Sequence, residues 1–139
     1  QHHDYVDELE MKVADALLLT HRSYLKPIMT LLEKFNVHGM AHITGGGIAG
    51  NLIRVIPDGL GAQVQIGKWN VPRIFDFIQD IGEISDLDMF QAFNMGVGYI
   101  IVLPSNQAES AVEKLREMGE AAYIIGEIVS GKHEVKLKD

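Results

Sequence analysis

Three consecutive glycines constrain this chain more than any other feature of its sequence. They occupy positions 45–47, between a short, largely apolar stretch at 40–43 and a helical pattern at 48–56 that Pro57 stops. A backbone without Cβ atoms adopts positive φ angles and lets a ligand approach closely. We therefore expect a strand, a tight turn and a helix in this order, with unpaired N–H groups at the start of the helix.

The expected turn has the chemistry of an anion site. A helix N-terminus carries about half a positive charge, and phosphate is its natural occupant. Around the turn, the candidate binding residues are Thr44, Gly45, Gly46, Gly47 and Asn51, and His42 is the candidate catalytic residue, as a hydrogen-bond or proton donor. The segment matches neither a P-loop nor a dinucleotide-binding motif. A tight turn without any ligand therefore remains the alternative interpretation.

Composition narrows the class of protein. The chain has 139 residues, enough for one domain with a buried core, and it contains no cysteine, which excludes disulfides and thiolate metal sites. The net charge of -7, without a cluster of Lys or Arg, argues against nucleic acid or an anionic membrane as the main partner. No apolar run approaches the ~20 residues of a membrane span, and no signal sequence is visible. We expect a cytoplasmic protein.

Helix and strand patterns are intermixed along the chain. Helices are expected at 5–20, 24–35, 48–56, 71–81, 85–93 and 107–118, and strands at 40–43, 60–66, 96–103, 122–129 and 134–137. Asn70 and Asn106 are expected to cap helices, Gly82 and Gly119 to follow helix ends, and Trp69 to lie in the core. The mixture predicts a layered α/β or α+β sandwich.

Two further segments are candidates for the same site. Asn94, Gly96 and Gly98 surround the start of the strand expected at 96–103, where they either line a ligand cleft or form a bulge with tight packing. Arg22 either clamps a phosphate bidentately or is a solvated, helix-capping residue.

Histidines give no metal-binding signature. Neither H-x-x-x-H nor H-E-x-x-H occurs, so no zinc site is predicted. His21, His38 and His42 are far apart in the sequence, and we do not expect them to converge in space.

Several motifs, in order, resemble one enzyme family. The runs at 37–47 and 93–98 are similar to runs in phosphoribosylformylglycinamidine cyclo-ligases, and 24–27, 69–75 and 119–126 also fit that family. His21-Arg22 stands where the family often has a threonine–arginine pair. The resemblance extends over roughly residues 14–129.

This resemblance implies a C-terminal domain with an α/β/α three-layer sandwich, a mixed sheet and a partly ferredoxin-like topology, here as one domain over residues 1–139. An absent N-terminal domain would carry most of the ATP and Mg²⁺ contacts and much of a homodimer interface. The family converts formylglycinamidine ribonucleotide and ATP to aminoimidazole ribonucleotide, ADP and phosphate. This chain alone is expected to fold, to bind phosphate weakly and not to turn over. A related enzyme, such as thiamine monophosphate kinase or selenophosphate synthetase, and a non-catalytic binding module remain alternatives.

Overall fold

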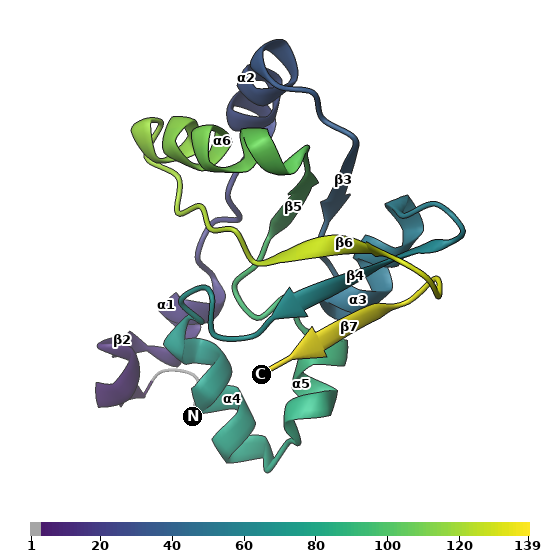
Figure 1. The fold of residues 1–139 in the computed structure, drawn as a ribbon. Helices are drawn as coiled ribbons and strands as arrows, with labels where there is room; N and C mark the ends of the chain where they lie inside the picture. Colours follow the sequence, from purple (N-terminus) through teal and green to yellow (C-terminus); the bar gives the residue numbers. More distant parts are fainter. Residues whose placement is uncertain (1–3) are drawn as a thin grey trace.

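The computed structural model describes residues 4–139, in which short strands and helices are intermixed (Figure 1). The strands are β1 (Tyr5–Val6), β2 (Met11–Lys12), β3 (Gly39–His42), β4 (Leu60–Gln65), β5 (Tyr99–Val102), β6 (Gly126–Ser130) and β7 (Val135–Lys138). The helices are α1 (Val13–Leu17), α2 (Leu25–Lys34), α3 (Gly47–Leu52), α4 (Arg73–Gly82), α5 (Asp86–Ala92) and α6 (Ser105–Glu117), with 3-10 turns η1 (Asp7–Leu9) and η2 (Ile53–Val55). The expected α+β class is confirmed.

The strands pair into three small sheets. β3 runs antiparallel to β5, while β4 lies between β6, its antiparallel neighbour, and β7, its parallel neighbour, so this sheet is mixed as expected. The order β3–α3–β4 followed by β5–α6–β6 repeats the strand–helix–strand unit of a ferredoxin-like topology, although β3 and β5 pair apart from β4 and β6. In Figure 1, α2 and α6 lie at one end, α4 and α5 lie at the other, and β3 to β7 lie between them, while β2 lies beside α1 and α4.

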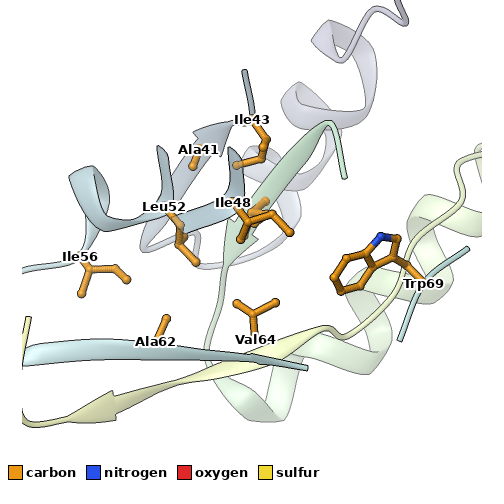
Figure 2. Packing of buried hydrophobic residues seen from close by; sticks show 9 residues of the cluster. Ala41, Ile43, Ile48, Leu52, Ile56, Ala62, Val64 and Trp69 are labelled. Atoms are coloured by element: carbon orange, nitrogen blue, oxygen red, sulfur yellow. The ribbon is translucent and has the colours of Figure 1, made fainter. Parts of the chain in front are cut away.

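Apolar side chains from β3, α3 and β4 meet in the core and anchor the glycine turn. Figure 2 shows Ala62 and Val64, from alternate positions of β4, pointing toward side chains of α3. Ile43 and Ile48 flank the turn on either side and are only 2% and 0% exposed. Because burial of one large aliphatic side chain contributes about 1.5–3 kcal/mol, both ends of the turn are firmly held. Trp69 is buried in the same cluster, as expected.

The helix expected at 5–20 is wrong over most of its length. β1 and β2 pair as a short antiparallel hairpin around η1, and only Val13–Leu17 is helical. Glu10 caps η1 with a φ of 56°, which interrupts any continuous helix. Leu9 is buried, and η1 contacts α4. The apolar spacing of this segment fits a helix, but packing of η1 against α4 favours the hairpin instead.

Helix starts also differ from expectation. The N-caps of α4 and α6 are Pro72 and Pro104, without side-chain cap hydrogen bonds, so the caps expected at Asn70 and Asn106 are wrong. In both cases a proline near the start fixes φ, and the helix begins at the residue that follows it. Ser85 does cap α5, because its hydroxyl accepts from the Asp88 N–H.

Strand β6 begins later than the pattern at 122–129 predicts. It runs from Gly126 to Ser130, and residues 122–125 lead into it without regular structure. A Cβ on Gly126 would overlap the Gln63 backbone on β4, so this glycine permits the close pairing at the start of the strand.

Several large apolar side chains near the start of the chain are exposed. Six of them lie in α1, α2 and the segment between these helices and are 45–81% exposed: Leu17, Leu18, Leu19, Leu25, Met29 and Leu32. Scattered apolar residues on a surface are ordinary, but such a concentration is typical of an interaction surface. Within residues 4–139, no helix is both long and apolar enough to cross a membrane.

Candidate functional site

The glycine turn joins the end of β3 to α3 in left-handed backbone geometry. Gly46 is the N-cap of α3 with a φ of 95°, and Gly47 begins the helix with a φ of 61°. Gly47 is buried, and a Cβ at this position would overlap the carbonyl oxygen of Phe90 at the end of α5. Its N–H donates to the Thr44 carbonyl at 3.1 Å. Gly47 therefore has a structural role in the turn, and its N–H is already hydrogen-bonded within the protein.

The side chain of Asn51 stabilises the turn by hydrogen bonds to its backbone. Its side chain is buried, and Nδ2 donates to the Gly47 carbonyl at 2.8 Å and to the carbonyls of Thr44 and Gly45 at 3.3 Å. The Thr44 hydroxyl in turn donates to Asn51 Oδ1 at 3.4 Å. These contacts engage the whole amide group, so Asn51 fixes the shape of the turn.

Two amides of the turn remain open. Gly45 and Gly46 are exposed, and among the hydrogen bonds of residues 4–139 their N–H groups have no protein acceptor. A Cβ built on Gly45 would meet no atom within 4 Å, so the space beside this residue is free. Helix α3 has six residues, so the attraction for an anion comes from these oriented amides more than from the helix dipole.

His42 lies beside the turn in a cluster of aromatic rings. It ends β3 directly opposite Tyr99 of β5, and the two rings are nearly parallel with centroids 5.9 Å apart. His21, from the segment before α2, places its Nε2 3.3 Å from Nε2 of His42. Tyr24 packs against both imidazoles. His38 lies apart from this pair and hydrogen-bonds Asn36.

Tyr24 connects this cluster to a neighbouring ion pair. Burial raises the pKa of its phenol, the adjacent Arg22 lowers it and Glu120 raises it, with a net upward direction, so the hydroxyl stays neutral at neutral pH. Arg22 Nη1 lies 2.6 Å from Glu120 Oε2. A phosphate bound by Arg22 would therefore share the guanidinium with this carboxylate.

The segment at 94–98 is a tight turn before β5. Asn94 Oδ1 accepts the Gly96 N–H at 2.9 Å, and Gly96 has a φ of 89°. A Cβ on Gly96 would lie 2.5 Å from Pro72 Cδ, and one on Gly98 would overlap the Tyr24 hydroxyl. Both glycines permit close packing, as the packing alternative expects, and both also line the cavity described next, so a role in ligand binding stays a prediction.

An open cavity of about 600 Å³ adjoins the aromatic cluster, because Tyr24 and Tyr99 also line it. Its walls are mostly apolar side chains of α2, α6, β4, β5 and the segment before β6, with Arg22, Tyr24 and Glu120 among them. Neither His42 nor the glycines at 45–47 line it. The glycine turn therefore does not line the cavity directly, and Tyr24 and Tyr99 lie between the cavity and His42.

Sequence patterns did not identify the neighbours of His42. Tyr99 faces it only through the register of two strands that are more than 50 residues apart in the chain. The three histidines do not converge, as expected, because His38 lies apart, but His21 and His42 do meet where the segment before α2 lies beside the end of β3. No local motif encodes this contact.

Comparison with known proteins gives the family. Residues 1–138 match the family described as AIR synthase related protein, C-terminal domain, and the chain belongs to this family. Among curated relatives, the phosphoribosylformylglycinamidine cyclo-ligase of Bacillus cytotoxicus is 46% identical over 88% of this chain. Those of Brevibacillus brevis and Alkaliphilus metalliredigens are each 44% identical over 96% of it. The chain spans only 35–38% of the length of these three relatives.

Proposed function

We propose that this chain is the C-terminal domain of an ATP-dependent phosphoribosylformylglycinamidine cyclo-ligase of purine biosynthesis. The proposed reaction closes the imidazole ring of aminoimidazole ribonucleotide from formylglycinamidine ribonucleotide. The names of the relatives, at 44–46% identity, favour this ligase over a thiamine monophosphate kinase or a selenophosphate synthetase. The short share of those relatives that the chain covers favours a domain that acts together with further polypeptide.

The glycine turn is the proposed phosphate site of the ribonucleotide. The observation that carries this proposal is the pair of exposed amides on Gly45 and Gly46, in a turn whose carbonyls Asn51 holds. Because the turn is preorganised, binding of an anion requires little reorganisation. Thr44 adds a hydroxyl whose existing bond to Asn51 is long, at 3.4 Å, and is easily exchanged for a phosphate oxygen.

His42 has two possible roles beside this phosphate. Its exposed ring can donate a hydrogen bond that stabilises charge on the phosphorylated intermediate, which is the role we assign first. Transfer of a proton during ring closure is the second role. Arg22, Gly96 and Gly98 line the neighbouring cavity, so their contribution to phosphate binding at the turn, like that of Asn94, stays a prediction.

ATP and Mg²⁺ are assigned to the rest of the longer protein. Among residues 4–139, no three His, Asp or Glu side chains are grouped so that they can hold one metal ion, so this part of the chain does not fit a magnesium site of its own. The exposed leucines between residues 17 and 32 support a covering N-terminal domain, because apolar area of this kind is stabilised by burial. A homodimer of the longer protein is part of the same proposal.

Phosphate titration tests the site on this chain directly. In ¹H–¹⁵N NMR spectra, inorganic phosphate is expected to shift the amide signals of Gly45 and Gly46, with a dissociation constant on the order of 1 mM because the remainder of the substrate is missing. Thr44→Val should weaken this binding several-fold. Thr30→Val removes a hydroxyl that bonds a helix carbonyl in α2 and serves as the matched control. Shifts confined to lysine-rich surface segments, with Gly45 and Gly46 unmoved, would contradict the phosphate site.

Turnover tests the role of His42. In the full-length enzyme, His42→Ala is expected to lower kcat by about a hundredfold to a thousandfold, in the range typical of a lost charge-stabilising or proton-transfer group. The readout is steady-state formation of aminoimidazole ribonucleotide. His38→Ala is the control, because His38 lies apart from the turn and bonds Asn36. Unchanged turnover of His42→Ala would remove this residue from the mechanism.

A further inference from the structure

We propose that His21 and His42 form a two-imidazole binding site for a divalent transition-metal ion. Their Nε2 atoms lie 3.3 Å apart. Two nitrogen ligands of one tetrahedral zinc ion, at bond lengths of about 2.0–2.1 Å, are themselves about 3.3 Å apart. The two rings thus already have the separation that a shared ion requires.

The surroundings hold both rings in place. The imidazoles are nearly parallel, with an interplanar angle of 15° and centroids 5.5 Å apart. Tyr99 lies along the His42 ring at 21°, in a position set by strand pairing, and Tyr24 meets the His21 ring edge-on at 75°. A metal ion therefore binds without ordering two free side chains, a cost that otherwise weakens surface sites.

The ligand set selects the class of ion. Imidazole nitrogens suit Zn²⁺, Ni²⁺ and Cu²⁺, whereas Mg²⁺ and Ca²⁺ require oxygen ligands. No third His, Asp or Glu of the described residues completes the group, so water or an added anion would fill the remaining positions. His21 and His42 are both exposed, which leaves these positions accessible.

The competing explanation is a simple hydrogen bond. At 3.3 Å, one imidazole N–H can also donate to the other ring nitrogen, with no metal involved. The two explanations differ in what happens when metal is added, because only a metal site gives saturable binding that needs both rings.

Metal titration of this chain decides between them. His2 and His3 are first replaced (His2→Gln, His3→Gln), because adjacent histidines bind metal by themselves. Zn²⁺ is then added while the side-chain ¹⁵N signals of the remaining histidines are followed by NMR, and Cu²⁺ is added in parallel for nitrogen hyperfine coupling by electron paramagnetic resonance. We expect one ion per chain, shifts at His21 and His42 together, and coupling to two imidazole nitrogens.

Single substitutions test whether metal binding depends on His21 and His42. His21→Gln and His42→Gln should each lower the affinity at least tenfold, and His38→Gln should leave it unchanged. Both pair members are exposed, and amide spectra verify that each variant remains folded. Absence of saturable binding in the His2/His3-substituted chain, or undiminished binding in His21→Gln, would overturn the proposal. Because no phosphate is present, this outcome is independent of the phosphate titration.

Discussion

Gly47→Ala is expected to lower the free energy of unfolding of this domain by about 2–5 kcal/mol. Two costs add up at this position. Gly47 has a φ of 61°, where a residue with a Cβ is disfavoured by roughly 1–2 kcal/mol. The new Cβ would also overlap the Phe90 carbonyl, and overpacking of a close contact costs about 1–3 kcal/mol because α3 and α5 must move apart.

Chemical denaturation followed by circular dichroism measures this loss. Gly45→Ala is the matched control in the same turn, because its Cβ would meet no atom within 4 Å and its φ lies outside the left-handed region. The control should differ from the parent chain by no more than about 0.5 kcal/mol. Equal stability of the two variants would show that α3 does not pack against α5 as described.

Asn51→Leu is expected to cost about 2–4 kcal/mol and to weaken phosphate binding. The substitution keeps the approximate volume but removes the donor that bonds the carbonyls of Thr44, Gly45 and Gly47. Each of the three lost hydrogen bonds contributes about 0.5–1.5 kcal/mol, and the shortest, to the Gly47 carbonyl, is buried. The turn loses its fixed shape, and with it the orientation of the two open amides.

Denaturation and the phosphate titration are both applied to this variant. Thr44→Val removes only the 3.4 Å bond to Asn51 Oδ1 and should cost less than about 1 kcal/mol. Thr44→Val therefore separates the loss of a ligand contact from the loss of the turn. Native stability in Asn51→Leu would contradict the supporting role of Asn51.

Predictions from the sequence were correct where the structure depends on neighbouring residues. The glycines at 45–47 predict the turn correctly because only glycine adopts such φ angles readily, and Pro57 and Gly119 correctly follow the ends of helical segments. Helix α2 and strand β4 were expected within one or two residues of their actual bounds, since their apolar spacing fits a single period.

The predictions from sequence were wrong where contacts between distant parts of the chain determine the structure. The spacing of Leu9 and Val13 fits a helix, but Leu9 is instead buried by contacts of η1 with α4. Asn51 was predicted to reach a ligand, and it is buried beneath the turn with its amide fully engaged. Whether a polar side chain faces a ligand or its own backbone depends on which side of the helix is covered, and local pattern does not contain that information.

By itself, the sequence determined the α+β class, the glycine turn and the family, because φ preferences, apolar periodicity and ordered motifs are all properties of neighbouring residues. Only the tertiary structure decided which amides of the turn are open and which residues surround His42. Strand register brings Tyr99 opposite His42, and the segment before α2 brings His21 within 3.3 Å. Such contacts join positions far apart in the chain, and they form only when the core around Ile43 and Ile48 has packed.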